Sequence, residues 1–237
     1  MGKLRPFIAE FIGTFALIFI GIGAIHHFGG VPGGLLGIAL AHGLTIAVMV
    51  SATGHISGGQ LNPAVSLGVF VAGKQSASTM LLYWVAQLAG ATAAACLCQM
   101  LAGSIGADVV KMGTPQLGEW ALKFGAASKI VPVSFGAGVC IEAVLTFFLV
   151  FVVLGTAVDA RGPKIGGLAI GLTVALDILF GGPLTGAAMN PARTFGPALA
   201  TGFWKDHAVY WIGPLLGGAL AGIIYGRILM PASDPKA

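Results

Sequence analysis

"GGQLNPAVSLG" occupies residues 58–68, and the related stretch "MNPAR" occupies residues 189–193. The chain of 237 residues contains only two asparagines, Asn62 and Asn190, and Pro-Ala follows each of them. A residue that the sequence otherwise avoids is therefore kept twice, in one context. The two triplets, Asn62-Pro63-Ala64 and Asn190-Pro191-Ala192, are the fixed points from which the rest of the sequence can be interpreted.

The composition around the triplets is that of a membrane protein. Hydrophobic residues make up 57% of the chain and charged residues 8%, against roughly 25% charged residues in a soluble domain. The mean hydropathy is +0.94. The net charge of +4 is modest, and neither a basic run nor an aromatic-basic patch indicates a nucleic-acid partner. The composition predicts an integral membrane protein.

Apolar runs of two lengths divide the chain. Six are long enough for the roughly 30 Å hydrocarbon core of a bilayer: about 7–26, 35–54, 80–102, 134–157, 165–181 and 207–229. Two shorter runs, about 63–73 and 191–202, begin at the triplets. A helix of about eleven residues rises only about 16 Å, so these runs predict half-helices. The glycine-rich backbone before them is tolerated at that depth where it lines a watery cavity, which indicates a pore.

The first run also allows another interpretation, because a short apolar segment after "MGKLRP" is typical of a signal peptide. The run continues for about 19 residues, carries Glu10 and lacks a convincing cleavage site. We therefore interpret it as the first span. Cys96, Cys98 and Cys140 lie in apolar segments without metal-ligand spacing, which predicts buried, unreactive thiols. No metal or other cofactor is expected.

The sequence repeats itself once. "AEFIGTF" (9–15) resembles "IEAVLTF" (141–147), with Glu10 lying 52 residues before Asn62 and Glu142 lying 48 residues before Asn190. Each half contributes three spans and one half-helix, and because three is odd the second half enters from the opposite side. The sequence predicts an all-α membrane protein with an inverted repeat. It forms one domain, 1–237, whose halves are about 1–125 and 126–237.

The charged residues predict an orientation. With six crossings both termini lie on one side, together with seven cations: Lys3, Arg5, Lys74, Arg161, Lys164, Arg227 and Lys236. Four cations fall opposite: Lys111, Lys123, Lys129 and Lys205. The positive-inside rule then predicts cytoplasmic termini and an external loop over about 103–133. The short tails and the lack of a targeting segment favour the plasma (inner) membrane.

The residue types in the triplets predict a chemical role for them. Proline suits the first position of a helix, and the asparagine before it can cap the helix through its side-chain oxygen. The NH2 group is then a donor at the pore centre, next to a helix end that carries about half a positive charge. Water that accepts from both asparagines is oriented, which interrupts a proton wire, and the positive helix ends repel cations. Alanine is small enough for the two tips to pack closely.

These motifs resemble the aquaporin, or major intrinsic protein, family over essentially the whole chain. The resemblance implies a channel of six helices and two half-helices that assembles as a homotetramer with one pore per subunit. It also implies a selectivity filter on the external side of the asparagines, at His42, Ile178, Ala187 and Arg193. Glu10 and Glu142 match the buried glutamates of the family, which hold loop N–H groups; carboxylates accept several such bonds.

The filter residues resemble those of the plant tonoplast-intrinsic subgroup. An arginine at this depth is costly and is typical of a transport pathway, and its guanidinium both donates to solutes and repels cations. Ile178 removes one donor from the filter, and Ala187 leaves room. The resemblance implies a channel for water and small neutral solutes: ammonia, urea, hydrogen peroxide and glycerol. Asp177 beside Ile178 is unusual at this depth, and the sequence assigns it no role.

Two other classes of protein remain to be weighed. A secondary transporter of a small polar solute also has inverted repeats and broken helices, but coupled transport normally needs an ionisable cluster near the midplane. The tips here offer neutral asparagines instead. An enzyme is not expected, because the sequence contains no nucleophile–base pair, metal cluster or phosphate loop. A passive channel is the favoured function.

Overall fold

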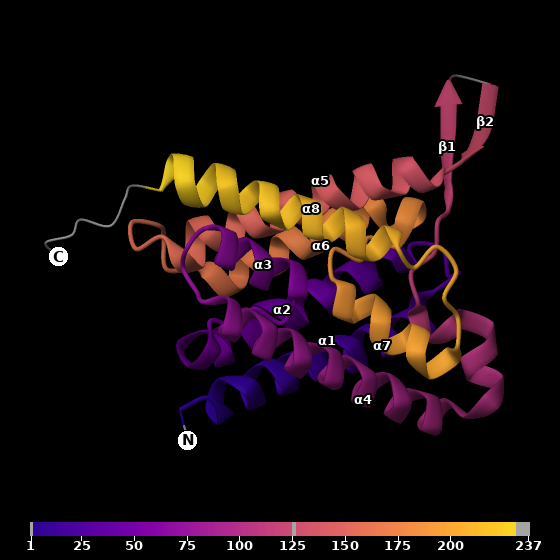
Figure 1. The fold of residues 1–237 in the computed structure, drawn as a ribbon. Helices are drawn as coiled ribbons and strands as arrows, with labels where there is room; N and C mark the ends of the chain where they lie inside the picture. Colours follow the sequence, from indigo (N-terminus) through magenta and orange to yellow (C-terminus); the bar gives the residue numbers. More distant parts are fainter. Residues whose placement is uncertain (1, 125–126, 231–237) are drawn as a thin grey trace, which may run out of the picture.

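The structure, a computed structural model, describes residues 2–124 and 127–230 (Figure 1). Six helices are long and apolar enough to cross a membrane, as the sequence predicts. They are α1 (Leu4–Phe28), α2 (Gly34–Ser57), α4 (Ala77–Val110), α5 (Phe135–Val153), α6 (Gly166–Thr185) and α8 (Val209–Ile223). The helices α5 and α8 continue as π-helical turns, Leu154–Val158 and Ile224–Leu229. Because α1 packs against α2 and α4, the structure favours a first span over a signal peptide.

The two half-helices begin at the triplets. They are α3 (Pro63–Val71) and α7 (Pro191–Thr201), with nine and eleven residues. They enter the bundle from opposite ends and point toward each other near its middle (Figure 1). The described ends of the chain both lie at one end of the bundle (Figure 1), which we call the terminal face. Of the cations predicted on that side, Lys236 lies outside the described residues.

Two glycines mark the axis that relates the halves. Gly43 on α2 and Gly171 on α6 each lie 19 residues before their asparagine, and α2 packs along α6. A Cβ atom on Gly43 would lie 2.5 Å from the carbonyl oxygen of Gly171, and Gly171 is equally crowded by Gly43. Only glycine allows the two backbones to approach this closely. The equivalent positions of the two glycines are those that a pseudo-two-fold axis requires.

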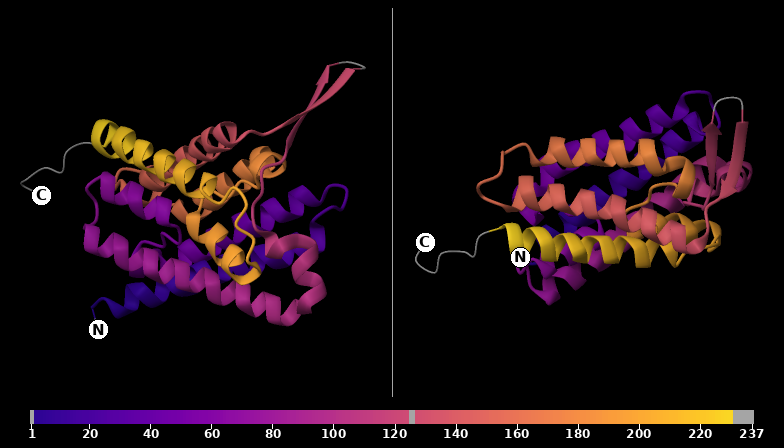
Figure 2. Two further views of the ribbon diagram at one scale, coloured as in Figure 1. Left: turned by 45° about the vertical axis from the view of Figure 1, so that its right-hand side comes forward. Right: turned by 90° about the horizontal axis from the view of Figure 1, so that it is seen from above.

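The connection between the halves contains an element that the sequence analysis does not foresee. After a kink at Gly103, α4 runs on to Val110, and a short 3-10 turn follows at Lys111–Gly113. The strands β1 (Glu119–Phe124) and β2 (Ala127–Pro132) then form an antiparallel hairpin. Figure 2 shows the hairpin projecting beyond the helices at the end opposite the terminal face. The mostly helical fold therefore carries one small sheet outside the membrane-spanning part.

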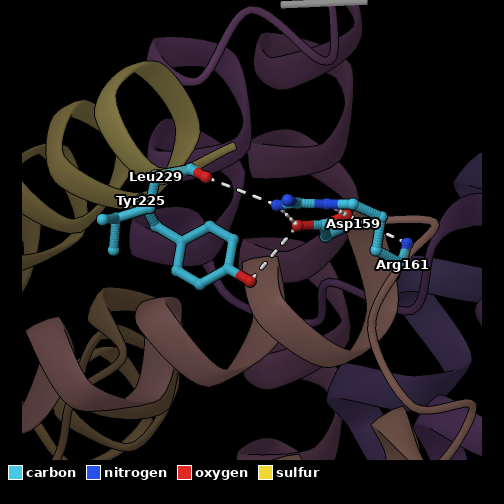
Figure 3. A network of polar contacts seen from close by, with 4 residues as sticks. All are labelled: Asp159, Arg161, Tyr225 and Leu229. Atoms are coloured by element: carbon cyan, nitrogen blue, oxygen red, sulfur yellow. Dashed lines mark hydrogen bonds and ion pairs between the residues drawn. The ribbon is translucent and has the colours of Figure 1, made fainter. Parts of the chain in front are cut away.

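A polar network fastens the α5–α6 connection to the end of α8 on the terminal face (Figure 3). Asp159 accepts two hydrogen bonds from the guanidinium of Arg161, at 3.0 and 2.6 Å, and one from the hydroxyl of Tyr225 at 3.3 Å. Arg161 also donates to the carbonyl oxygen of Leu229. The hydrogen bonds from Arg161 lower the pKa of Asp159 from its usual 3.8 to about 2. This network fixes the terminal-face end of the last helix.

The prediction that all three cysteines are buried is wrong for two of them. Cys98 is buried, whereas Cys96 and Cys140 are exposed at the surface of the bundle. The cause is the apolar composition of the whole helix. In lipid an apolar residue is equally suited to the core and to the outer face, so hydropathy alone does not separate the two.

Candidate functional site

The two asparagines cap the half-helices as the sequence predicts. Asn62 has an extended backbone, and its Oδ1 accepts the N–H of Ala64 at 2.8 Å. Asn190 has the same conformation, and its Oδ1 accepts from Ala192 at 3.0 Å and from Arg193 at 3.3 Å. Each cap satisfies N–H groups that the first turn of a helix leaves without an internal partner. The proline that follows has no N–H to satisfy.

Each asparagine also holds the opposite half of the molecule. The Nδ2 of Asn62 donates to the carbonyl oxygen of Met189 at 2.8 Å, and the Nδ2 of Asn190 donates to that of Leu61 at 3.0 Å. The sequence predicts that both NH2 groups face the pore. A carboxamide nitrogen carries two hydrogens, so one binds the other tip and one is left for the pore. These crossed bonds join residues 127 and 129 positions apart.

Glu10 holds the backbone in front of the first tip. Its Oε1 accepts from the hydroxyl of Ser57 at 2.6 Å and from the N–H of Gln60 at 2.8 Å. Its Oε2 accepts from the N–H of Leu61 at 2.6 Å and from the side chain of Gln87 at 2.8 Å. The carboxyl group is fully buried, and these four donors satisfy it in place of water.

Glu142 repeats this arrangement in the second half. Its Oε1 accepts from the hydroxyl of Thr185 at 2.6 Å and from the N–H of Ala188 at 2.9 Å. Its Oε2 accepts from the N–H of Met189 at 2.7 Å. Both glutamates therefore have the role that the family resemblance implies. The hydroxyl of Tyr210 adds a bond to the carbonyl oxygen of Thr185, just as Tyr83 does for Ser57.

The residues that the glutamates hold are in an uncommon conformation. Leu61 has a φ of 51° and Met189 a φ of 52°, in the left-handed region that side chains other than glycine rarely adopt. Each directly precedes its asparagine. The strained turn points the carbonyl oxygen of each residue at the opposite asparagine, where it accepts the crossed bond. Strain of this kind persists where the surroundings fix it, and here the glutamate bonds do so.

A narrow cavity runs past the meeting point of the tips. Both asparagines line it, as do all four residues predicted for the filter: His42, Ile178, Ala187 and Arg193. The rest of the lining is mainly aliphatic, with Val50, Val65, Val153 and Val174 among its members. Gln60 lines the cavity between the asparagines and the terminal face. A narrow, mostly apolar passage with a few fixed polar groups is the arrangement expected of a pore for small solutes.

The two ionisable residues predicted for the filter are fixed by backbone carbonyls. An Nη atom of Arg193 donates to the carbonyl oxygen of Gly113 at 2.8 Å. The Nδ1 of His42 lies 2.9 Å from the carbonyl oxygen of Ile38, so the donating tautomer carries its proton there. The Nε of Arg193 is buried and has no protein partner among the described residues. The contact with Gly113 escapes sequence analysis because that residue lies in the irregular connection between the halves.

Asp177 does not join its neighbour Ile178 in the cavity lining. Its side chain is 7% exposed. Its Oδ2 has no hydrogen-bond partner in the part of the chain that the structure describes. The structure therefore gives no account of why an aspartate occupies this position.

Comparisons with known proteins agree with the geometry. The sequence profile of the family described as "Major intrinsic protein" matches residues 1–225. The protein "Aquaporin TIP4-4" of Zea mays is 44% identical, over 97% of this chain and 88% of its own length. "Aquaporin TIP2-1" of Arabidopsis thaliana is 38% identical, over 99% of this chain and 91% of its own. These relatives confirm the predicted subgroup resemblance.

A solved structure supports the same conclusion. The X-ray structure of the aquaglyceroporin from Plasmodium falciparum has a TM-score of 0.80 and 25% sequence identity, over 97% of this chain and 98% of its own. The profile match, the relatives and this fold agree with the two capped half-helices and the cavity between them. The chain belongs to the major intrinsic protein family, the membrane channels that include the aquaporins.

Proposed function

We propose that the chain is a passive channel that carries water and small neutral solutes through this cavity and excludes protons and cations. The observation that carries the proposal is the crossed asparagine pair where two helix N-termini meet. The positive ends of two helix dipoles, about half a charge each, converge there. A water that accepts the free N–H of each asparagine turns its own hydrogens away, which breaks the chain of hydrogen bonds that protons need.

The filter residues support a solute range wider than water. Arg193 supplies a fixed positive charge and donors, and His42 supplies a second polar group across the cavity. Ile178 and Ala187 complete the lining without adding a hydrogen-bonding side chain. A filter with one apolar wall and one small residue admits solutes larger and less polar than water. We propose ammonia, urea, hydrogen peroxide and glycerol as this class.

Osmotic swelling and shrinkage of proteoliposomes tests the proposal. Stopped-flow light scattering measures the water permeability under a sucrose gradient, and then the permeability to urea, glycerol and ammonia. We expect rates above those of empty liposomes, without any ion gradient. Water flux at the lipid background would overturn the channel. Flux that requires an ion gradient would indicate the alternative, a secondary transporter.

A single substitution tests the filter. We expect Ile178→His to lower the permeability to urea or ammonia more than the permeability to water, because imidazole narrows the passage and adds a polar group. Ile178→Val is the matched control, since it keeps an apolar wall, and it should leave the ratio unchanged. Equal losses for all solutes, or no loss at all, would contradict the assignment of Ile178 to the filter.

Assembly and location complete the proposal. We propose one channel domain over 1–237 with halves of about 1–125 and 126–237, assembled as a homotetramer, as the family resemblance implies. Native mass spectrometry of the detergent-solubilised protein tests the assembly. We also propose cytoplasmic termini in the plasma (inner) membrane, and the cations on the terminal face support that orientation. Labelling of single introduced cysteines tests the side on which the termini lie, and membrane fractionation tests the location. Recovery of the protein in an organelle fraction would contradict the plasma-membrane proposal.

A further inference from the structure

Gln60 is the polar group of the pore nearest the terminal face. Five polar side chains line the cavity: His42, Gln60, Asn62, Asn190 and Arg193. The asparagines lie at the meeting point of the tips, and His42 and Arg193 lie beyond it on the side away from the termini. On the terminal side Gln60 is therefore surrounded by aliphatic lining such as Val50, Val65 and Val153. A solute on this stretch has one side chain with which to form hydrogen bonds.

A second glutamine, outside the cavity lining, fixes the orientation of Gln60. Gln75 follows α3 and donates from its Nε2 to the carbonyl oxygen of Ser66 at 2.6 Å. That carbonyl can only accept, so it fixes which end of the Gln75 amide is nitrogen. The Oε1 of Gln75 consequently faces Gln60 and accepts from its Nε2 at 2.9 Å. The return contact, from the Nε2 of Gln75 to the Oε1 of Gln60, is longer at 3.4 Å.

The pairing leaves Gln60 with unused hydrogen-bonding capacity. A carboxamide has two N–H donors and two acceptor lone pairs. Gln75 takes one donor and, weakly, one lone pair. The remaining N–H and lone pair of this side chain have no partner among the described residues, and Gln60 is one of the residues that line the pore. The group carries no charge, so unlike a carboxylate it does not attract cations.

We propose that Gln60, oriented by Gln75, determines specificity at the terminal-side end of the pore, where it admits small amides and other neutral solutes that both donate and accept. The inference rests on the proposed passive conduction through the same cavity. Gln75 is a positioning residue, because it acts on solutes only through Gln60. The site is separate from the Arg193 filter on the other side of the asparagines.

The pair discriminates among solutes because their dehydration costs differ. Moving a polar group from water into an apolar stretch is unfavourable unless a hydrogen bond replaces the lost one. Urea carries four N–H donors and a carbonyl, and it must give up more of its hydration than a single water does. A fixed donor and acceptor at this point therefore lower the barrier for urea more than the barrier for water. A carboxamide held in place also loses less conformational entropy when it binds the solute.

Isosteric substitutions in proteoliposomes test the proposal. Methionine has nearly the length of glutamine without its amide, so Gln60→Met removes the hydrogen bonds and keeps the bulk. We expect urea permeability to fall about two- to tenfold, the worth of one hydrogen bond, and the urea-to-water ratio to fall with it. Gln75→Met should shift the ratio in the same direction by less. Gln99→Met is the matched control, because Gln99 on α4 is not part of the cavity lining.

A double variant separates positioning from a merely structural role. Because Gln75 acts through Gln60, the urea-to-water ratio of Gln60→Met/Gln75→Met should equal that of Gln60→Met alone. An additive double variant, or a Gln75→Met ratio equal to wild type, would overturn the proposal. So would a Gln60→Met variant with an unchanged ratio, or a wild type that passes water but not urea.

The design remains decisive if Gln60→Met fails to fold. Gln75→Met alters no lining side chain and still tests the orienting contact through the ratio. A wild type whose water permeability stays at the lipid background would instead overturn the proposed channel function itself. That result is distinct from a conducting wild type with an unaltered ratio in the variants.

Discussion

The two half-helix tips share one hydrogen-bond frame and differ in what surrounds it. In both halves a buried glutamate binds two backbone N–H groups and a hydroxyl in front of the asparagine. The first glutamate, Glu10, accepts a fourth bond from Gln87. Gln87 lies four residues after Tyr83, and the residue four positions after the equivalent Tyr210 is Pro214. Proline has no side-chain donor, so Glu142 has no such fourth bond from this position. The first tip is thus held more completely.

The second tip carries a charge instead. The third residue after Asn62 is Val65, and the third after Asn190 is Arg193. Arg193 is buried with its Nε unpartnered among the described residues. The comparison suggests a division of labour. The shared glutamate frame builds the tips, and we propose that the differing residues discriminate among solutes: Arg193 at one tip and Gln60 before the other.

The largest effect is expected from substitution of the two glutamates, because this removes the hydrogen-bond frame that both tips share. Glu10→Ala and Glu142→Ala each leave two buried backbone N–H groups without an acceptor, at about 1–3 kcal/mol per group. We expect both variants to lose about 2–6 kcal/mol of unfolding free energy. Retention of the folded peak in size-exclusion chromatography after heating measures the loss. The Gln variants keep one oxygen and should lose about half as much. A neutral result in either half would contradict the shared frame.

The second prediction removes the charge that distinguishes the tips. Arg193→Val gives the second tip the residue of the first, so that both present only dipoles and asparagines. We expect proton and ammonium leak to rise by at least about tenfold, since two unit charges at about 4 Å repel each other by roughly 4 kcal/mol at an effective dielectric constant of 20, and about 1.4 kcal/mol already corresponds to a factor of ten in rate. A pH-sensitive dye inside proteoliposomes measures the leak. Arg193→Lys keeps the charge and is the control. An unchanged leak in Arg193→Val would mean that the helix dipoles and the asparagines exclude cations without Arg193.

The sequence predicts the frame well because the frame is locally encoded. A proline at N1 behind an N-capping asparagine marks the start of each half-helix, and apolar runs mark the spans. The repeated glutamate motif points to Glu10 and Glu142 before any coordinates are known. Their partners follow in part from the repeat itself, since Ser57 and Thr185 each lie five residues before an asparagine.

The contacts between segments far apart in the sequence are not locally encoded. The crossed asparagine bonds join residues 127 and 129 positions apart, and although the repeat indicates that the two tips are equivalent, it does not show which carbonyl oxygen each asparagine binds. Gln75 reaches Gln60 through the turn after α3, a geometry that depends on where that short helix ends. The hairpin at residues 119–132 is short and lies outside the membrane, where hydropathy gives no guidance. Sequence reasoning thus predicts the scaffold and, through the family resemblance, the glutamate contacts, but it misses the crossed asparagine bonds and the Gln60–Gln75 contact.

The third prediction makes the first half resemble the second. Gln87→Met removes the fourth donor to Glu10, together with its contact to the hydroxyl of Ser66. A hydrogen bond to a charged group is worth about 1.5–3 kcal/mol. Part of this loss is offset, because methionine also removes the Oε1 of Gln87, which is buried without a partner among the described residues. We expect a loss of about 1 kcal/mol in thermal unfolding and unchanged water permeability. A large loss of permeability would show that Gln87 acts on the pore as well.

The smallest effect is expected for the helix connections at equivalent positions in the two halves, α1–α2 and α5–α6. The α1–α2 connection, residues 29–33, contains no charged residue, whereas the α5–α6 connection carries the Asp159–Arg161 pair (Figure 3). Because Arg161 lowers the pKa of Asp159 from 3.8 to about 2, the carboxylate stabilises the fold above pH 3.8. That stabilisation is lost as the pH falls through about 2, where the folded protein also takes up the proton.

Asp159→Asn should therefore unfold at a slightly lower temperature than wild type at pH 5–7, and the difference should shrink below pH 3.8 and vanish once the pH has fallen below about 2. The effect is small because the side chain of Arg161 is 59% exposed, and water and salt screen such pairs. Thermal unfolding of both proteins across this pH range measures the difference, and Asp206→Asn in the α7–α8 connection is the matched control. An undiminished difference at and below pH 2 would mean that Asp159 stabilises the terminal face through shape and neutral hydrogen bonds. The α5–α6 connection, like the uncharged α1–α2 connection, would then be held without a contribution from charge.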